Sequence, residues 1–338
     1  MKASFTKKNR IFAAFFFLHI KKMKITNLIQ KGNTAFSFEI LPPLKGSNIQ
    51  KVFKDIDALR EFNPQYINIT THRSEMVFRT LPNGLFEQTS VRHRPGTVAI
   101  AAAIQNKYKI PVVPHIICSG FTKSETEYAL IDLHFLEIDN LLVLRGDKAK
   151  HENAYKSQPD GHNHAIDLQK QINDFNAGRF LDGSEFEKPA NPFSYGVAGY
   201  PEKHEGAPNF DSDIFWLKEK VKAGADYIVT QMFFDNAKYF SFVERCRAEG
   251  ITIPIIPGIK PINLLNQLNV LPKIFHIDIP EDFARELRKC KSNEDATVVG
   301  VEWCLAQAKE LKERGVPSIH FYSLAAVESV RKVAEGVY

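Results

Sequence analysis

The segment Ala35–Leu41 reads AFSFEIL, and its bulky apolar residues alternate with small or polar ones. Alternate side chains of a β-strand point to opposite faces, so each type of residue lies on a face of its own. The two sets are Phe36, Phe38 and Ile40 on one face and Ser37 and Glu39 on the other. This pattern predicts a strand whose apolar face packs on helices and whose other face points into a barrel.

Seven more apolar runs of strand length follow, each bounded by turn residues: Tyr66–Thr71, Ile110–Cys118, Asn140–Gly146, Phe193–Tyr200, Tyr227–Phe234, Thr252–Ile259 and Ser318–Ser323. Amphipathic stretches of helical length lie between them, among them Ile49–Phe62, Ser124–Glu137, Asp213–Ala223 and Ala237–Glu249, with a terminal helix near Ala326–Gly336. This alternation predicts an α/β fold, a single-domain (β/α)8 TIM barrel over residues 23–338. An open doubly wound sheet is the alternative, but it usually shows a G-x-G-x-x-G motif after its first strand, which this chain lacks.

The chain carries a formal net charge of +5, and that charge belongs to its first 22 residues. These hold six Lys or Arg residues and no Asp or Glu, so the rest of the chain is close to neutral. No basic stripe predicts a nucleic-acid partner. The apolar run Ile11–Ile20 is too short to span a bilayer, and Lys21 and Lys22 stand where a signal peptide would be cleaved. We interpret residues 1–22 as a dispensable extension or an upstream start, with Met23 as the next possible start.

The cysteines and histidines indicate neither a disulfide framework nor a metal site. The four cysteines lie far apart and form no C-x-x-C pair, which is typical of a reducing cytoplasm. We expect Cys118, at the end of an apolar strand, to be a buried free thiol. His162 and His164 are close in sequence, but no carboxylate or cysteine cluster completes a metal site around them.

Two connections are much longer than the others. Arg73–Thr97 and Asp147–Pro192 both follow the carboxyl ends of strands, the face on which barrels build their active sites. The second includes a helical stretch near His164–Ala177. Long loops at this face more often serve as lids or cofactor clamps than as plain connections.

Glu39 is the first candidate catalytic residue, because it points inward at the mouth of the predicted barrel. Asn68 and Thr70 share the inward parity of the second strand. Burial disfavours an ionised carboxyl group, so we expect a raised pKa for Glu39, as a general acid needs near neutral pH. A solvated glutamate at a strand end is an equally probable interpretation from the pattern alone.

Other strand ends carry groups that suit a flat or phosphorylated ligand. The fourth strand ends in Arg145-Gly146-Asp147, where Gly146 allows a ligand to approach the backbone and Arg145 supplies a cation. A tight turn closed by an Arg–Asp ion pair is the alternative. Gln231, after the sixth strand, can both donate and accept hydrogen bonds, although a lone Gln is more often structural. His115 has the inward parity of its strand, where a functional role and a buried structural one are equally probable.

These segments together resemble the methylenetetrahydrofolate reductases, in order from about Phe36 to Ser323. The matching pieces are FEILPP (38–43), PHIIC (114–118), LRGD (144–147), AGYPEKH (198–204), AGADYIVTQMFFD (223–235), IPGIKPI (256–262) and HFYSL (320–324). The resemblance implies a flavin barrel in which NADH or NADPH reduces FAD and leaves. The folate then takes its place and is reduced from 5,10-methylenetetrahydrofolate to 5-methyltetrahydrofolate. It also implies a homo-oligomer.

The resemblance assigns roles to individual residues. Glu39 matches the catalytic acid that opens the five-membered ring of the folate, and Asp147 matches an aspartate near both flavin and pterin. Gln231 matches a residue that hydrogen-bonds the substrate, and Gln267 fits a further folate contact. The positions that match FAD contacts are Thr70, His115, Arg145, Gly146, Asp147, Ala165, Tyr200, His204, Asp213 and Lys220.

The chain departs from the family pattern at two folate positions. Ala325-Ala326 stand where many relatives have Asn-Arg, and Leu271 stands where they have a stacking Phe. Two alternatives therefore remain: a flavin-free pterin-binding barrel, and an inactive homologue that binds flavin or folate. No regulatory extension is expected after the barrel, which favours NADH over NADPH as the reductant.

Overall fold

The computed structural model describes residues 24–29, 33–148, 152, 155–324 and 326–338. The leader predicted for residues 1–22 lies outside the described residues. None of the described helices is both long and apolar enough to cross a bilayer.

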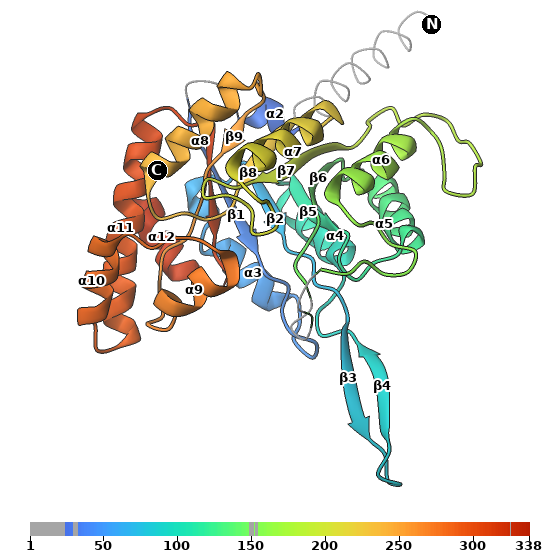
Figure 1. Ribbon diagram of the computed structural model, residues 1–338, viewed down its shortest axis with the longest axis horizontal. Coiled ribbons are helices and arrows are strands. Elements are labelled where there is room, and N and C mark those ends of the chain that lie inside the picture. The colour runs from blue at the N-terminus through green and yellow to red at the C-terminus, as the bar shows by residue number, and fades with distance from the viewer. Residues whose placement is uncertain (1–23, 30–32, 149–151, 153–154, 325) are drawn as a thin grey trace, which may run out of the picture.

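A parallel sheet wraps almost completely around one axis (Figure 1). Its nine strands lie in the order β10-β11-β1-β2-β5-β6-β7-β8-β9. Their bounds are β1 Ala35–Ile40, β2 Tyr66–Ile69, β5 Val112–Ile117, β6 Asn140–Leu144, β7 Ser194–Gly199, β8 Tyr227–Thr230, β9 Ile255–Ile256, β10 Gly258–Ile259 and β11 Ser318–Tyr322. Strand β9 pairs with β8 and β10 pairs with β11, so these two pieces, separated by Pro257, act as one strand that closes the ring. The predicted (β/α)8 barrel is confirmed.

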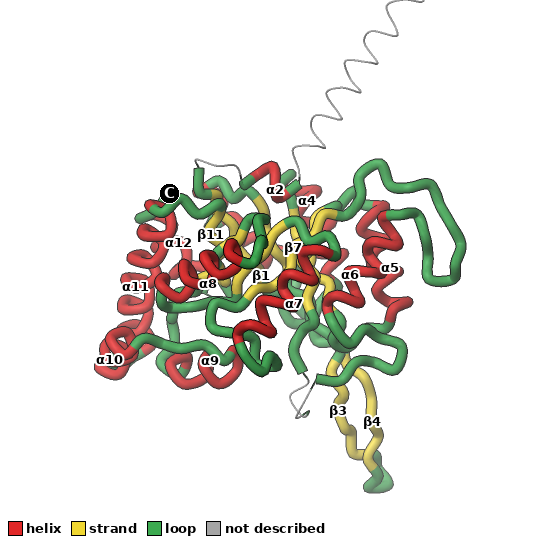
Figure 2. The backbone as a smooth tube through the Cα atoms, turned by 45° about the horizontal axis from the view of Figure 1, so that its top comes forward, coloured by secondary structure: helices red, strands yellow, loops and turns green. Residues whose placement is uncertain are grey.

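Helices cover the outside of the sheet (Figure 2). They are α3 Gln50–Asp57, α4 Thr97–Tyr108, α5 Lys123–Phe135, α6 Ala165–Asn176, α7 Phe210–Lys222, α8 Asn236–Ala248, α9 Gln267–Phe275, α10 Glu281–Lys289, α11 Asn293–Glu313 and α12 Val327–Glu335, with the 3-10 turn η1 Arg60–Phe62 after α3. Several of these helices begin at a residue whose side chain caps the helix. Thr122 and Glu125 form a capping box at α5, and Asn209 accepts the Ser212 N–H at α7.

Two of the three apolar core clusters follow the parity of the strands. Phe36 and Phe38 belong to the large cluster between the sheet and the helices. Ala35, Tyr66 and Val113 belong to a smaller cluster inside the barrel. The outward and inward faces predicted from AFSFEIL are therefore confirmed. The inward face becomes polar toward the carboxyl ends of the strands, where Ser37, Glu39 and Asn68 are all buried.

A short helix before the first strand, α2 (Ile25–Leu28), fills the amino-terminal end of the barrel. Ile25 and Ile29 are buried and belong to the interior cluster. The backbone N–H of Ile25 also donates to Asn140 Oδ1 at 3.2 Å. The helix α2 was not predicted, because four residues show too little periodicity to indicate a helix.

The connection Arg73–Thr97 contains regular secondary structure, which was not predicted. Strands β3 (Glu75–Thr80) and β4 (Phe86–Val91) form an antiparallel hairpin around the Pro82-Asn83-Gly84 turn. The hairpin projects from the barrel (Figure 1). Phe78 and Phe86 on it are 69% and 73% exposed. Two short alternating runs around an Asn-Gly turn are a sequence pattern that indicates such a hairpin. In Asp147–Pro192, the expected helical piece is α6.

The thiols are free: Cys118, Cys246 and Cys304 are buried and Cys290 is partly exposed. Burial raises the pKa of Cys118 to about 12, so the buried thiol predicted there is confirmed. Among the residues that the structure describes, no group of three or more His, Cys, Asp or Glu side chains is placed to hold a metal ion. His162 Nε2 instead lies 2.6 Å from Gln171 Oε1.

Helix α11 can approach the barrel only because residue 300 is a glycine. A Cβ at Gly300 would lie 1.9 Å from the carbonyl oxygen of Ile262. We expect Gly300→Ala to lower the free energy of unfolding by about 2 kcal/mol, because overpacking costs about 3 kcal/mol and helix propensity returns about 1 kcal/mol. Urea unfolding measures this change.

Gly336→Ala is the matched control for that substitution. The nearest atom to its added Cβ is Leu305 Cδ1, at the end of a side chain that can rotate away. Equal stability losses in the two variants would contradict the packing argument.

Candidate active site

A layer of buried polar side chains closes the carboxyl-terminal end of the barrel interior. The carboxyl group of Glu39 lies at its centre, with the residue only 5% exposed. Glu39 Oε1 accepts a hydrogen bond from the Thr70 hydroxyl at 2.6 Å. Glu39 Oε2 lies 3.5 Å from His115 Nε2 and 3.7 Å from His320 Nε2.

Strand register brings these groups together. Glu39 of β1 stands opposite Asn68 of β2 and Tyr322 of β11. Asn68 Oδ1 lies 3.3 Å from His115 Nε2, which connects β2 to β5. The side chains that parity predicted to point inward, Glu39, Asn68, Thr70 and His115, therefore meet in one network.

The raised pKa expected for Glu39 is wrong. Burial does raise it, but His115, His320 and the Thr70 hydroxyl together outweigh burial and lower the pKa of Glu39 to about 2. The expectation considered only the apolar character of a barrel interior. It did not include the two imidazoles that the fold places within 4 Å of the carboxyl group.

A second group of polar side chains follows β6. Gly146 has a φ of +78°, which favours glycine, and a Cβ there would lie 2.9 Å from Ser119 Cβ. Arg145 Nη2 lies 3.6 Å from Glu205 Oε1, so the ion pair at this turn involves Glu205 and not Asp147. Arg145 Nε is buried with no hydrogen-bond partner among the described residues.

Asp147 lies at the exposed edge of this group. Partial desolvation and the nearby Glu205 raise its pKa, against the lowering effect of Arg145, Arg73 and His72. The structure thus surrounds Asp147 with both signs of charge. Its backbone carbonyl also accepts the Ser119 hydroxyl at 2.7 Å.

A third group lies after β7 and on α7. The ring centroids of Tyr200 and His204 are 4.7 Å apart. The backbone N–H of His204 donates to Asp213 Oδ2 at 2.9 Å. Lys220 Nζ donates to the Ala198 carbonyl at 2.9 Å, and burial lowers its pKa to about 8. Burial, Arg145 and Lys220 lower the pKa of His204 to about 4. Arg145 and Lys220 therefore both act on the imidazole of His204.

The contacts of the remaining predicted site residues indicate no particular role. Ala165 is the first residue of α6. Gln231 is partly buried, and its Oε1 accepts the N–H of Met232 at 2.9 Å. Gln267 Oε1 accepts the N–H groups of Asn263 and Leu264, so part of its polar capacity holds the loop before α9.

Of the residues that depart from the family pattern, Leu271 and Ala326 are described by the structure, whereas Ala325 lies outside the described residues. Leu271 is 5% exposed in an apolar cluster with Met232 and Phe234. Ala326 is buried at the start of α12.

Two residues of the polar layer, His320 and Lys260, were not predicted from the sequence. His320 is completely buried on β11 and stands beside Ser37 in the register of the two strands. Lys260 follows β10, and its Nζ lies 3.4 Å from the Tyr322 carbonyl. The inward parity of β11 could have identified His320, since its neighbours Ile319 and Phe321 belong to the outer core cluster.

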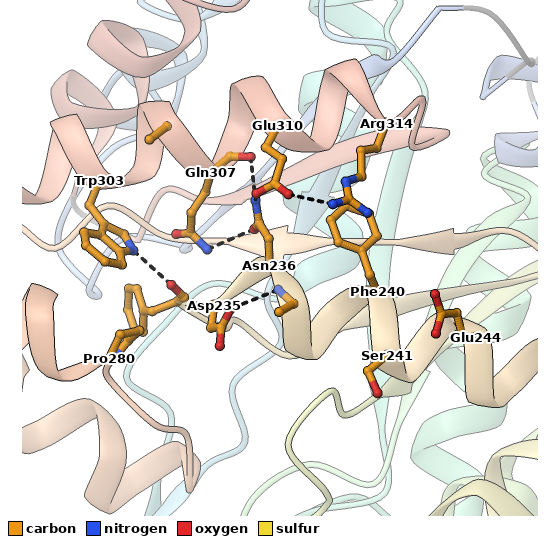
Figure 3. A pocket seen from close by; sticks show the side chains of 13 residues that line it. Asp235, Asn236, Phe240, Ser241, Glu244, Pro280, Trp303, Gln307, Glu310 and Arg314 are labelled. Atoms are coloured by element: carbon orange, nitrogen blue, oxygen red, sulfur yellow. Dashed lines mark hydrogen bonds and ion pairs between the residues drawn. The ribbon is translucent and has the colours of Figure 1, made fainter.

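A cavity of about 600 Å³ lies elsewhere, on the outer side of the barrel between α8 and α11. Figure 3 shows Trp303, Gln307 and Glu310 on one side of it and Phe240 and Ser241 on the other. It contains none of the predicted site residues.

The fold and the polar layer define a class: a closed β/α barrel with acid–base groups at the carboxyl ends of its strands and two partly buried cations, Arg145 and Lys220, beside them. A sequence model of the methylenetetrahydrofolate reductase family matches residues 24–337, and the chain belongs to that family.

Named relatives agree with this assignment. Methylenetetrahydrofolate reductase (NADH) 1 of Arabidopsis thaliana is 29% identical over 324 residues, covering 93% of this chain and 49% of the plant protein. The probable NADPH enzyme of Caenorhabditis elegans is 28% identical, covering 93% and 44%. This chain thus spans about half the length of these relatives. The 5,10-methylenetetrahydrofolate reductase of Pectobacterium carotovorum is 26% identical, covering 88% of each chain.

A solved structure supports the fold alone. An uncharacterized protein from Clostridium thermocellum, described as binding two copies of 5-methyl-5,6,7,8-tetrahydrofolic acid, has a TM-score of 0.53 and 15% identity. The match covers 92% of this chain and 96% of that one.

Proposed function

We propose that this protein reduces 5,10-methylenetetrahydrofolate to 5-methyltetrahydrofolate, with electrons that NADH or NADPH delivers through bound FAD. The observation that carries the proposal is the buried Glu39, held by Thr70 and two imidazoles at the active face of the barrel. A barrel mouth that surrounds one carboxyl group with proton donors and acceptors suits reduction of a substrate whose ring must be protonated to open.

The residues present fit FAD. Its diphosphate requires cations. Arg145 has a buried Nε with no hydrogen-bond partner in the described part of the chain, and burial makes the ammonium form of Lys220 less favourable. Thr70 and His115 would bind the flavin or its ribityl chain, and Gly146 leaves room for close approach. Tyr200, His204, Asp213 and Ala165 would complete the site. The bound FAD would supply a hydride carrier between the nicotinamide cofactor and the folate, as a ping-pong sequence requires.

The protein's own residues would bind and protonate the substrate. Glu39 would deliver a proton to N10 of the folate, which breaks the bond between N10 and the methylene carbon. Asp147 would place a carboxyl group near the pterin and the flavin. Gln231 and Gln267 would offer amide groups to the pterin, the nicotinamide or both.

The setting of this reaction is part of the proposal. We infer a flavoprotein of the cytoplasm that supplies methyl groups for methionine biosynthesis in one-carbon metabolism. We further infer that it works as a homo-oligomer, with small molecules as partners and no nucleic acid or stable membrane insertion. The nearly neutral charge of the chain after residue 22 supports the exclusion of nucleic acid.

Anaerobic half-reactions test the proposal. NADH or NADPH should bleach the yellow protein, and methylenetetrahydrofolate should then restore the oxidised spectrum with formation of 5-methyltetrahydrofolate. A protein that stays colourless after incubation with FAD would support a flavin-free pterin-binding barrel. A protein that bleaches but is not reoxidised by the folate would be an inactive homologue, and either result would overturn the assignment.

A further inference from the structure

The carboxyl group of Glu205 links two segments of the candidate site that are far apart in the sequence. Glu205 lies in the loop between β7 and α7. Its Oε1 lies 3.6 Å from Arg145 Nη2, in the turn after β6. Its Oε2 lies 2.7 Å from Nε2 of His276, the residue at which α9 ends. One carboxylate therefore has two partners, one on each oxygen.

The contact with Arg145 is the weaker of the two. A separation of 3.6 Å is longer than a hydrogen bond, and the side chains of Arg145 and Glu205 are 25% and 33% exposed. Ion pairs that water can screen contribute little. The guanidinium of Arg145 also lies 4.9 Å from the centre of the Tyr155 ring, and its Nε has no hydrogen-bond partner among the described residues. Arg145 is thus held loosely, and a stronger anionic partner can replace Glu205.

Glu205 places a negative charge beside a site that is proposed to bind a diphosphate. After desolvation, Glu205 is the largest cause that raises the pKa of Asp147. It also opposes the lowering of the His204 pKa by burial and by two nearby cations. Like charges brought together in a binding site lower its affinity. Glu205 must therefore either orient Arg145 for the ligand or occupy Arg145 until the ligand binds.

The geometry favours occupation over orientation. A carboxylate that orients a guanidinium usually does so through two short parallel hydrogen bonds. Here one oxygen of Glu205 faces one nitrogen of Arg145 at 3.6 Å, and the other oxygen is turned toward His276. A carboxylate only accepts hydrogen bonds, so the ring nitrogen that faces it at 2.7 Å carries a hydrogen. His276 therefore remains as a partner for Glu205 when another anion takes Arg145.

The loop that carries Glu205 is fixed to the segment that follows His276. Glu202 Oε1 lies 2.7 Å from Lys238 Nζ on α8, and Glu202 Oε2 accepts the backbone N–H of Asp278 at 2.9 Å. Lys238 also pairs with the carboxylate of Asp278. Asp278 comes two residues after His276, so these contacts hold the loop against the end of α9. The contact between Glu205 and His276 thus belongs to a fixed frame.

We propose that Glu205 is a placeholder for the diphosphate of FAD: its carboxylate pairs with Arg145 in the ligand-free protein and keeps only His276 as a partner when the anionic ligand binds. The identity of the ligand as FAD rests on the proposed function, whereas the pairing of Glu205 with Arg145 does not. Glu205 is thus a positioning residue that acts through Arg145. It weakens the binding of a diphosphate, and His276 offsets part of this loss by drawing the carboxylate away.

Titration of the apoprotein with FAD, followed by quenching of flavin fluorescence, tests the role of Glu205. Glu205→Gln removes the charge and nearly keeps the size of the side chain, so it should bind FAD roughly three- to tenfold more tightly. Riboflavin carries no phosphate, and its affinity should not change. Unchanged FAD affinity would overturn the placeholder. Weaker FAD binding would overturn it as well, because it would mean that Glu205 orients Arg145.

His276→Asn tests the second partner of Glu205. Asn tolerates the left-handed backbone at this position, where φ is +53°, but its shorter side chain gives up the contact with Glu205. The carboxylate is then left to Arg145, so FAD should bind roughly two- to threefold less tightly. In protein that already carries Glu205→Gln, the same substitution should have little effect. Equal effects in the two backgrounds would mean that His276 does not act through Glu205.

Glu87→Gln is the control for net charge, because Glu87 lies exposed on β4 of the projecting hairpin. It should bind FAD with wild-type affinity.

Inorganic pyrophosphate separates failure of the placeholder from failure of the proposed function. Wild-type protein that does not bind FAD would remove the proposed cofactor, and pyrophosphate then replaces FAD as the probe in a calorimetric titration. Glu205→Gln should bind pyrophosphate more tightly than wild-type protein does. If Glu205→Gln shows no such gain, the placeholder is wrong whatever the cofactor is.

Discussion

Replacing Glu39 with Gln is expected to abolish reduction of methylenetetrahydrofolate and to leave reduction of the flavin by NADH almost intact. Gln is nearly the same size and can still accept from Thr70, but it has no proton to deliver. General acid catalysis contributes roughly 10²- to 10⁴-fold, and we expect a loss in that range for the folate half-reaction. Stopped-flow absorbance of the flavin measures each half-reaction separately.

A second expectation concerns how the two half-reactions of the wild-type protein depend on pH. Because His115, His320 and Thr70 hold the pKa of Glu39 near 2 in the absence of ligands, Glu39 itself is a carboxylate at neutral pH. The proton needed for the folate must then come through its neighbours. The folate half-reaction should therefore slow as the pH rises, while flavin reduction should depend less on pH.

Glu87→Gln is a matched control, because Glu87 lies exposed on β4 of the projecting hairpin. It should behave like wild-type protein in both half-reactions. If Glu39→Gln loses flavin reduction to the same extent as folate reduction, the residue supports the structure of the site and is not the acid. If it loses neither, the assignment of Glu39 is wrong.

The barrel could be predicted from the sequence because strand parity and the alternation of strands with helices both depend on residues that are close together in the chain. Strand parity depends on adjacent residues, so AFSFEIL alone was enough to place Phe36 outside and Glu39 inside. Burial of the carboxyl group followed from the same pattern. The chemical environment of that group did not follow, because His115 and His320 lie far from Glu39 in the sequence.

The wrong predictions about the chemical environment of Glu39 and Arg145 have the same origin. The direction of the Glu39 pKa depends on the sum of burial and partners, and only burial could be read from a strand pattern. The ion-pair partner of Arg145 is Glu205, from the loop after the next strand, β7, so the Arg–Asp pair considered as an alternative for this turn is not formed. The helix α2 and the hairpin were missed for different reasons: the first is too short, and the second lay inside a segment interpreted only by its length.

Replacing Lys220 with Met is expected to weaken FAD binding by roughly 10- to 100-fold at pH 7, because hydrogen bonds to charged groups contribute about 1.5 to 3 kcal/mol. The ammonium is held by the Ala198 carbonyl and lies near Asp213, and burial lowers its pKa to about 8. Such a cation gains more from an anionic ligand than a solvated lysine would. Quenching of flavin fluorescence during titration of the apoprotein measures the affinity.

The same group predicts how this affinity depends on pH. Below about pH 8 Lys220 is positive, and above it the free protein loses that charge, so FAD binding should weaken as the pH rises from 7 to 9. Lys220→Met should remove most of this dependence, because no ammonium remains to be deprotonated. His204 cannot replace it, since its pKa of about 4 keeps the ring neutral over this range.

Lys218→Met is the control from the same helix, because Lys218 pairs with Glu249 at the surface. It should bind FAD with wild-type affinity and keep the wild-type pH dependence. Lys220→Arg should recover part of the lost affinity, since guanidinium keeps its charge at every pH tested, and it should bind FAD without the decline above pH 8. Wild-type affinity in Lys220→Met would place the diphosphate elsewhere. Arg145, whose Nε has no hydrogen-bond partner among the residues that the structure describes, would then be the cation that the negative charge requires.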